Sequence, residues 1–231
     1  MIPSEETSET LGIPFLARLT SGDRSALLSE GRECSWLEND TIIHQGDPSD
    51  YVVMLVHGYA KSTMVDERGY EAVLKLYATA DIVGVDGVFL KGNRRTMSVR
   101  CLTKCRGIVL SGDHFRTLLE RNPSIAFAVL GEMTYRLREG DRKRLWMASR
   151  SVRERLADTL LELARKFSVR DRDGLRIAVP LSQRDLAGML GSSREAVAKL
   201  FKELRDKGVV ATRYREIVIV RPDVLRRMRH W

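Results

Sequence analysis

Cysteine is scarce in this sequence, and long apolar segments are missing from it. Only three cysteines occur in 231 residues: Cys34, Cys101 and Cys105. An odd and sparse set excludes a disulfide framework. No apolar run approaches the roughly 20 residues that a transmembrane helix needs. The first ten residues, MIPSEETSET, are acidic and polar, so they are no secretory signal. We therefore expect a cytoplasmic protein without a membrane partner.

The sequence also lacks the motifs of an enzyme. It contains no metal-ligand cluster, nucleophile elbow or phosphate-binding loop. The neighbours Asp113 and His114 resemble a helix start and not a catalytic pair. Residues 97–102 alternate as a strand does, and a strand that continued would place Cys101 and Cys105 on one face about 13 Å apart. We therefore predict reduced thiols, no metal site and no catalytic function.

Positive charge is concentrated in the C-terminal part of the chain. The net charge is +8, and residues 150–231 contain 20 Lys and Arg against 11 Asp and Glu. Residues 1–149 contain 19 against 20. Basic charge confined to one domain indicates a polyanionic partner, with nucleic acid first and an anionic membrane surface second. A solvated surface that only keeps the protein in solution is the alternative interpretation.

The spacing of apolar residues changes along the chain and predicts an α+β protein. Residues 11–32 read as short helices. Residues 34–110 contain short apolar runs separated by Gly and Asp turns, which predicts an antiparallel roll or sandwich. Residues 151–167 form a further amphipathic helix, and residues 169–174 are expected to be a charged loop.

A long helix is expected to begin near Pro123, which fits a first helical turn, with Asn122 as its cap. Apolar residues then recur at alternating spacings of four and three, which favours a two-chain coiled coil and hence a homodimer. A helix packed on its own domain needs a similar stripe and is the alternative. Gly140 and Arg144 share the register but suit it poorly, so they weaken the coil or face a ligand. The predicted dimer seam contains Ala126, Leu130, Met133, Leu137 and Met147.

Residues 181–210 carry the pattern of a helix-turn-helix. Gly191 can supply the positive φ of a tight turn, and Ser192 or Ser193 can cap the second helix. That helix, residues 193–206, has one apolar stripe and presents polar side chains opposite it, near the end that meets base edges in the major groove. Arg can bond guanine O6 and N7 together, and Glu can accept from cytosine N4. The candidate base-reading residues are Arg194, Glu195, Ala198 and Lys199.

Candidate phosphate contacts surround this helix pair. Ser182, Gln183 and Ser193 are short polar groups at helix starts, where they suit phosphate oxygens. Residues 209–220 predict the two-stranded wing of a winged helix, with Arg213 and Arg215 near its tip and available to phosphate. Any amphipathic helix pair of similar spacing would match the helix-turn-helix alone. Its combination with the charge asymmetry and the wing indicates a DNA-binding protein.

From about residue 15 to residue 220 the chain resembles the cyclic-AMP receptor protein and FNR family of bacterial regulators. The segment Ser193-Arg-Glu-Ala-Val-Ala-Lys is similar to the family's Ser-Arg-Glu-Thr-Val-x-Arg. The resemblance implies a sensor β-roll at 1–112 like a cyclic-nucleotide-binding domain, a dimerisation helix and hinge at 113–149, and a winged helix-turn-helix domain at 150–231. It gives Arg194 and Glu195 the base-reading roles. Lys199 occupies the position where the family often has a second base-reading Arg. Lys lacks the planar fork of Arg, which predicts weaker discrimination at the base that this residue contacts.

The resemblance also implies an effector pocket, and the residues here depart from the family's pattern. Arg95 and Thr96 could still hold a phosphate, but Val85 replaces the carboxylate that binds the ribose hydroxyl. A site built on hydrogen bonds loses affinity heavily when its partners are absent, so we predict that cyclic AMP is not the effector. The positions that match the phosphate cassette are Gly84, Val85, Arg95 and Thr96, and the adenine-binding pair falls on Gly140 and Asp141.

Other effectors stay open, and no cofactor is assigned with certainty. Three cysteines are too few for an iron–sulfur cluster, whereas a haem on His44, His57 or Cys101 is conceivable. Asp141 and Arg144, with the pair at 94–95, would suit a guanine nucleotide or a cyclic dinucleotide. The same residues also suit an ordinary ion-paired helix surface, and a regulator without any effector is an equal alternative.

The leading hypothesis is a dimeric, sequence-specific regulator that binds a palindromic site in double-stranded DNA. It would recruit or block RNA polymerase, and residues 169–174 lie where members of the family contact the polymerase. A non-specific architectural DNA-binding protein is the alternative from a different functional class.

Overall fold

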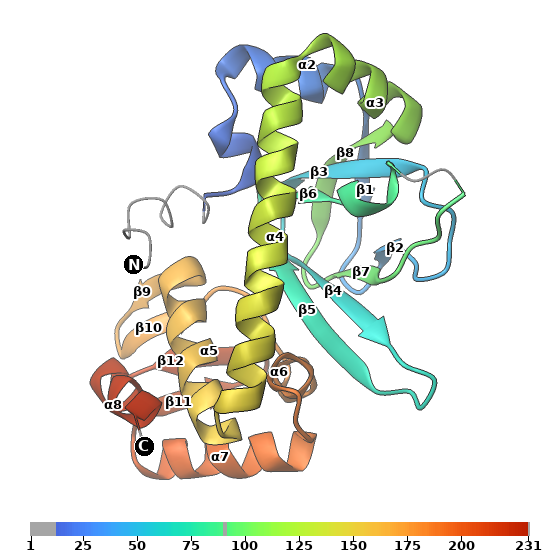
Figure 1. The fold of residues 1–231 in the computed structure, drawn as a ribbon. Coiled ribbons are helices and arrows are strands. Elements are labelled where there is room, and N and C mark those ends of the chain that lie inside the picture. The colour runs from blue at the N-terminus through green and yellow to red at the C-terminus, as the bar shows by residue number, and fades with distance from the viewer. Residues whose placement is uncertain (1–12, 90–91, 231) are drawn as a thin grey trace, which may run out of the picture. The chain divides into compact units, whose positions relative to one another are not determined.

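Antiparallel strands make up most of the N-terminal part of the chain, as the short apolar runs predict. The structure is a computed structural model that describes residues 13–89 and 92–230 (Figure 1). Two short helices, η1 (Phe15–Arg18) and α2 (Ser21–Ser29), precede the strands. The strands are β1 (Arg32–Trp36), β2 (Thr41–Ile43), β3 (Tyr51–His57), β4 (Ala60–Val65), β5 (Glu71–Tyr77), β6 (Ile82–Val83), β7 (Ser98–Cys101) and β8 (Cys105–Ser111).

These strands form two four-stranded sheets, ordered β1-β8-β3-β6 and β2-β7-β4-β5. Strand β3 is buried on both faces because its side chains alternate between two apolar clusters. Val53 and Leu55 pack between the sheets with residues of β2, β4 and β7. Val52 and Met54 pack instead against helices, in a cluster that includes Phe15. This double burial explains the unbroken apolar run at residues 52–56.

The prediction that Cys101 and Cys105 share one face of a continuous strand was wrong. Strand β7 ends at Cys101, residues 102–104 turn, and β8 begins at Cys105 in the other sheet. Leu102 and Thr103 both donate their N–H groups to the carbonyl of Tyr59, which holds the turn closed. Both cysteines are buried and free, as reduced thiols were expected to be.

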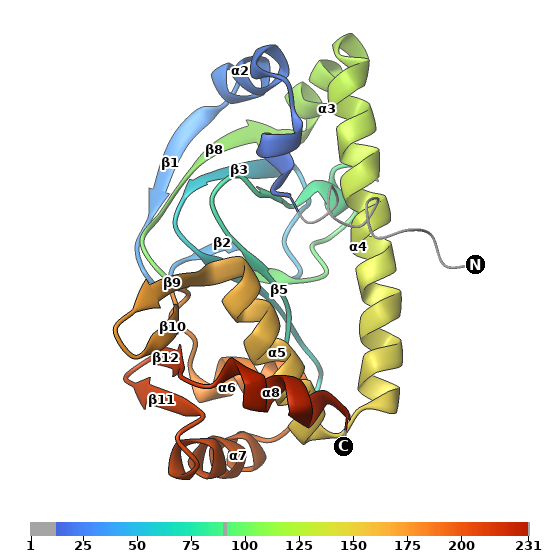
Figure 2. The same ribbon diagram turned by 90° about the vertical axis from the view of Figure 1, so that its left-hand side faces the viewer.

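Strands β1 to β8, residues 32–111, are called the roll, and two helices follow it. Helix α3 (Gly112–Arg121) begins at Ser111, whose hydroxyl accepts the N–H of His114, so Asp113 and His114 do form a helix start. Helix α4 (Pro123–Ser149) begins at Pro123 as expected. Asn122 directly precedes it, but the side-chain amide donates backward to the carbonyl of Leu118 at 2.9 Å. Asn122 therefore closes α3, while its own carbonyl accepts the first N–H groups of α4. Figure 2 shows α4 beside the strands of the roll.

The C-terminal part is a winged helix-turn-helix built on a small sheet of order β11-β12-β10-β9. Residues 169–174, expected as a loop, lie instead in a hairpin of β9 (Ser168–Asp171) and β10 (Gly174–Ile177) that turns at residues 172–173. The remaining elements are α5 (Val152–Phe167), α6 (Gln183–Leu190), α7 (Arg194–Asp206), β11 (Val210–Arg213), β12 (Glu216–Ile219), α8 (Pro222–Arg227) and η3 (Met228–His230).

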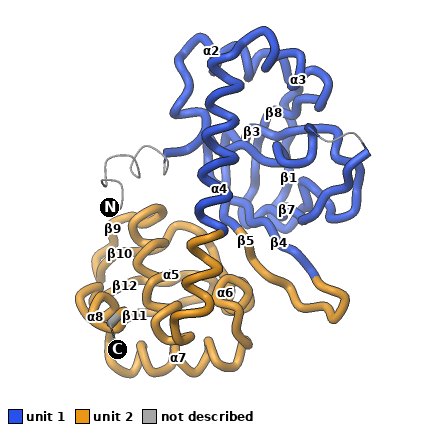
Figure 3. Tube along the Cα trace, in the orientation of Figure 1, with its two compact units in different colours: residues 1–65, 75–140 blue, residues 66–74, 141–231 orange. Residues whose placement is uncertain are grey.

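The chain divides into two units (Figure 3). The first contains residues 1–65 and 75–140, and the second contains residues 66–74 and 141–231. The β4–β5 hairpin tip therefore belongs with the helix-turn-helix: a Cβ on Gly188 of α6 would lie 2.8 Å from the Glu71 carbonyl oxygen. Lys143 also donates to the carbonyl of Val73 at 3.2 Å. The three-part division expected from the sequence stays a prediction.

Candidate nucleic-acid interface

The helix-turn-helix forms where the sequence predicts it. Helix α6 is capped by Ser182 and Asp185, and α7 by Ser193, whose hydroxyl accepts the N–H of Ala196 at 3.1 Å. Between them Gly191 has φ 59°, the left-handed conformation that favours glycine. A Cβ there would also meet Cε of Met147, which is the far end of a flexible side chain and can move aside. The turn, and not the packing beneath it, therefore needs glycine. The residues that anchor the pair are buried, namely Leu186, Ala187 and Leu190 of α6, and Val197, Phe201 and Leu204 of α7.

The opposite face of α7 presents the predicted base-reading residues. Arg194, Glu195 and Lys199 are exposed, and Ala198 is half-buried between them. The Glu195 carboxylate accepts its own backbone N–H and the Ser193 hydroxyl, and these bonds lower its pKa below the ordinary value. Glu195 is therefore ionised at neutral pH and can only accept hydrogen bonds. This suits it to the amino group of cytosine.

A groove of about 310 Å³ connects the helix pair with the wing. Four arginines line it, and Glu216 is the one acidic residue among its lining residues. Its walls come from the start of α6, the start of α7 and the turn between β11 and β12, so three separate elements direct cationic groups into one channel. Such a channel fits the anionic backbone of DNA. The lining includes Ser182, Gln183, Arg184, Arg194, Arg213, Tyr214 and Arg215.

The predicted phosphate contacts differ in how available they are. The Arg213 side chain is 79% exposed at the wing tip. Arg215, with φ 53°, donates instead to the carbonyl of Pro180 at 3.1 Å. The Ser182 hydroxyl donates to the Asp185 carboxylate at 2.6 Å, so its first role is to cap α6. Gln183 is half-buried at the rim of the groove and lies in the first turn of α6.

Two residues of the groove were missed by the sequence analysis. Arg184 is exposed on the first turn of α6, and Tyr214 at the wing tip is 92% exposed. The signal for Tyr214 was available, because a bulky aromatic side chain in a two-residue turn has little of its own chain to pack against. The signal for Arg184 was weaker, because an exposed Arg on a short helix is common.

Two of the predicted effector residues of the roll, Val85 and Arg95, are buried and contact other parts of the protein. Val85 is fully buried in the apolar core. Arg95, only 5% exposed, donates to the carbonyls of Gly84, at 2.8 Å, and of Tyr51. Its guanidinium also lies 4.8 Å from the centre of the Tyr51 ring. Thr96 is exposed. The phosphate-binding Arg that the resemblance implies is therefore already bonded to backbone oxygens.

The effector residues expected on α4 form an ordinary helix surface. Gly140 and Asp141 are exposed, and Asp141 is ion-paired with Arg144 of the next turn. This pair corresponds to the ion-paired alternative that the sequence left open. His44 and His57, the histidines considered for haem, are both exposed. Within residues 13–89 and 92–230, no group of three or more His, Cys, Asp or Glu side chains is placed to hold a metal ion.

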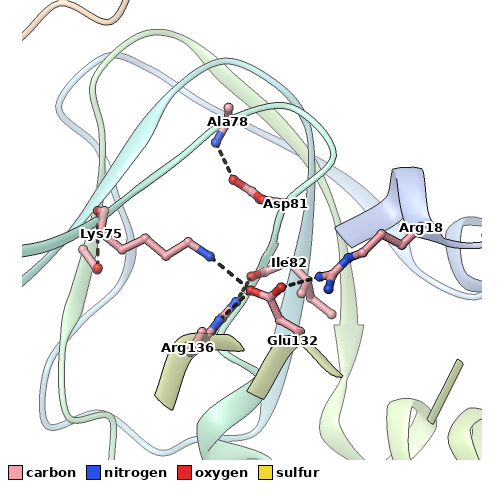
Figure 4. Close-up of polar contacts among 8 residues, drawn as sticks. Arg18, Lys75, Ala78, Asp81, Ile82, Glu132 and Arg136 are labelled. Atoms are coloured by element: carbon pink, nitrogen blue, oxygen red, sulfur yellow. Dashed lines mark hydrogen bonds and ion pairs between the residues drawn. The ribbon is translucent and has the colours of Figure 1, made fainter. Parts of the chain in front are cut away.

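A buried ion cluster connects the N-terminal half of α4 to the roll (Figure 4). The sequence did not predict this cluster. Glu132 of α4 is 4% exposed. Its Oε1 accepts from Nζ of Lys75 at 3.1 Å and from Nε of Arg136 at 2.8 Å, and its Oε2 accepts from Arg18. Arg136 also donates to the carbonyl of Ile82 at 2.6 Å. The Glu132 carboxylate therefore joins η1, β5 and α4, and Arg136 extends the cluster to β6.

The predicted dimer seam separates into two groups in this single chain. Leu130 and Leu137 are 60% and 65% exposed, and Phe127, absent from the prediction, is 73% exposed. Ala126 and Met133 are half-buried and pack against the core of their own unit. Met147 is also half-buried, beneath Gly191. The seam itself stays a prediction, with its apolar surface centred on the leucines and Phe127.

Comparisons with known proteins agree with this architecture. A cyclic nucleotide-binding domain model matches residues 33–122, and a Crp-like helix-turn-helix domain model matches residues 154–228. The chain is 31% identical over 180 residues to the cAMP-activated global transcriptional regulator CRP of Salmonella typhimurium, covering 78% of this chain and 85% of the relative. It is 25% identical over 195 residues to a CRP-like cAMP-activated global transcriptional regulator of Mycobacterium tuberculosis, covering 84% and 87%.

Solved structures share the fold at lower identity. The c-di-GMP-responsive global regulator CLP of Xanthomonas campestris superposes with a TM-score of 0.78 at 22% identity, covering 87% of this chain and 99% of that one. A CRP/FNR family regulator of Thermus thermophilus gives a TM-score of 0.72 at 22% identity, covering 87% and 99%. In the described residues, no helix has the length and apolar character needed to cross a bilayer.

Proposed function

Because the chain belongs to the CRP/FNR family of DNA-binding transcription regulators, we propose that it binds a palindromic DNA site as a homodimer and reads the bases through α7. The arginine-lined groove between α6, α7 and the wing carries this proposal. Members of this family are regulators and not enzymes. A protein that acts on the chromosome of a bacterium works in the cytoplasm, with RNA polymerase as its expected partner.

We assign direct base contacts to Arg194 and Glu195, which stand exposed on the first turn of α7. Arg194 has the planar fork that can bond O6 and N7 of one guanine, and ionised Glu195 can accept from a cytosine. Lys199 lies one turn further along and contributes a point charge. Arg213 at the wing tip and Gln183 at the start of α6 are assigned to phosphates, which position the protein without reading the sequence.

Three observations support the proposal that cyclic AMP is not the effector. The matched cyclic nucleotide-binding domain suggests a nucleotide as the class of effector. In this chain, however, Arg95 is bonded to backbone carbonyls, and Val85 offers no polar atom at the end of its side chain. Gly140 likewise offers no side chain for a base. We therefore propose that cyclic AMP does not control this regulator.

The test begins with selection of binding sites from random double-stranded DNA by the wild-type protein. We expect a palindrome whose half-sites lie about one helical turn apart. Arg194→Ala should lower affinity for the selected site by about 5- to 150-fold, because a bidentate contact contributes about 1–3 kcal/mol of discrimination. Affinity for unrelated DNA should change little. Arg170→Ala, on strand β9 at the sheet edge opposite to the wing, is the matched control.

Two outcomes would overturn the assignment. Full discrimination in the Arg194→Ala variant would remove Arg194 from base reading. A selection that yields no common sequence, together with a steep fall of affinity with salt, would favour the architectural alternative, in which phosphate contacts supply nearly all of the binding.

A further inference from the structure

The ion cluster around Glu132 has an unusual balance of charge for a buried site. Three cationic side chains meet one carboxylate, and the side chains of Arg18, Arg136 and Glu132 are only 10%, 18% and 6% exposed. Asp81 is a further acidic group near them, and its carboxylate accepts the N–H of Ala78 at 2.9 Å (Figure 4). Without Glu132, buried cations of the roll and of α4 would repel one another. The carboxylate of Glu132 offsets this repulsion, and its loss would leave buried cations with less compensation.

The anion comes from the protein itself. Lys75 and Arg136 lie near the ring of Tyr77, at 5.0 Å and 5.9 Å from its centre, and both direct nitrogen atoms to Oε1 of Glu132. With the contact from Arg18, both oxygens of the carboxylate are occupied. Cationic side chains gathered between a helix and a sheet would otherwise be suited to an anionic group such as a phosphate.

The Glu132 carboxylate and the exposed leucines lie on opposite sides of α4. At 100° per residue, the Glu132 position lies about 160° from Leu130 and about 140° from Leu137 around the helix axis. Ion pairs on one side therefore fix the rotation of the helix on the roll, and this rotation determines where the apolar side faces.

We propose that Glu132 is a built-in counter-ion that takes the role an anionic effector would otherwise have in fixing α4 on the roll. The nucleotide-free protein is then already competent to bind its DNA site, and any nucleotide tunes this binding without switching it on. The inference rests on the proposed function, because its consequence is read as DNA affinity.

The experiment measures affinity of the full-length protein for its selected site by fluorescence anisotropy, without nucleotide and with cyclic AMP, cyclic GMP or cyclic di-GMP. We expect each nucleotide to change the wild-type affinity by less than about fivefold, below the usual range of allosteric coupling. Glu132→Gln should weaken specific binding by about 5- to 150-fold. Glu132→Asp, which keeps the charge, should bind the selected site with an affinity much closer to that of the wild type than Glu132→Gln does. Glu120→Gln, on the exposed side of α3, should match the wild type.

A second measurement separates a missing anion from general damage. Glu132→Ala leaves a space beside three cations, and added formate should restore its DNA affinity, whereas chloride at equal ionic strength should not. Wild-type protein that binds its site tightly only when a nucleotide is added would overturn the inference. So would a folded Glu132→Gln variant with unchanged affinity, or an alanine variant that formate fails to rescue.

Failure of the inference is distinguishable from failure of the proposed function. If the wild-type protein selects no DNA sequence with or without nucleotides, the proposed function itself is wrong. If it selects a site but needs a nucleotide to bind it, only the role of Glu132 is wrong. Should Glu132→Gln or Glu132→Ala fail to fold, Glu132→Asp keeps the charge and tests the cluster, while the wild-type comparison still decides whether the nucleotide-free protein binds its site.

Discussion

Acid should destabilise the β-roll through Glu132 in a way that a surface carboxylate would not show. Burial alone would raise the pKa of Glu132, but the charges of Lys75 and Arg136 and the hydrogen bonds from both outweigh burial and lower it from 4.5 to about 2. Because the folded state has the lower pKa, ionised Glu132 stabilises the fold above about pH 4.5. This stabilisation is lost as the pH falls through about 2. At about 1.4 kcal/mol for each pKa unit, the depression corresponds to about 3 kcal/mol.

The cations of the cluster indicate a loss of stability of the same size. Burial and the neighbouring Arg136 charge lower the pKa of Lys75, while Glu132 acts in the opposite direction. Replacing Glu132 with Gln removes a carboxylate that offsets this repulsion. Loss of one partner from a buried ion pair typically costs about 3–5 kcal/mol, which agrees with the value from the pKa.

Urea unfolding over a range of pH measures this contribution. Trp36 on β1 reports the roll when Trp146 and Trp231 are replaced by Phe in every variant. At neutral pH, Glu132→Gln should lower the free energy of unfolding by about 3 kcal/mol. The free energy of unfolding of this variant should approach that of the parent as the pH falls below 4.5, because protonated Glu132 resembles Gln. Glu120→Gln should follow the parent throughout. A difference between Glu132→Gln and the parent that stays constant down to acid pH would refute the reasoning.

Three further outcomes follow from the structure. Gly191→Ala should destabilise the helix-turn-helix by about 1–2 kcal/mol through its φ of 59°, which thermal unfolding would measure. Leu130→Glu, and separately Leu137→Glu, should shift sedimentation from dimer to monomer, since each places a charge in the apolar seam. Lys199→Arg should sharpen the preference at one base pair of each half-site, measured by binding to sites substituted at single positions, because Arg can form the bidentate contact that Lys cannot.

The DNA-binding part could be predicted because its signals are local. A capping Ser, a turn glycine and an apolar stripe lie within a few residues of one another, and α6, α7 and the wing formed where these signals stood. Local patterns failed at Cys101 and Cys105, where a three-residue turn interrupts an alternation that looked continuous. Residues 169–174 failed similarly, because charged side chains concealed a short exposed hairpin.

The cluster on α4 could not be found from the sequence, because its members are distant along the chain. Arg18 and Lys75 meet Glu132 only after the roll has folded. A partial signal existed: Ile125, Val129, Glu132 and Arg136 follow the same spacing of four and three as the seam. The apolar stripe dominates the periodicity of this helix, and charged positions beside such a stripe usually face solvent on an amphipathic helix.

Helix α4 has two stripes, one that packs on the roll and contains Glu132, and one that exposes Leu130 and Leu137. This arrangement explains why a charged residue stands at position 132. An apolar stripe alone would define the rotation of α4 on the roll less sharply, since the hydrophobic driving force is non-directional. Ion pairs and the bond from Arg136 to Ile82 have fixed directions, so only one rotation satisfies them. Apolar side chains of similar volume would often give equal or greater stability than a buried ion pair. The cluster is therefore better understood as a means of setting the orientation of the exposed leucines, and with it the geometry of the proposed dimer on its two proposed half-sites of DNA.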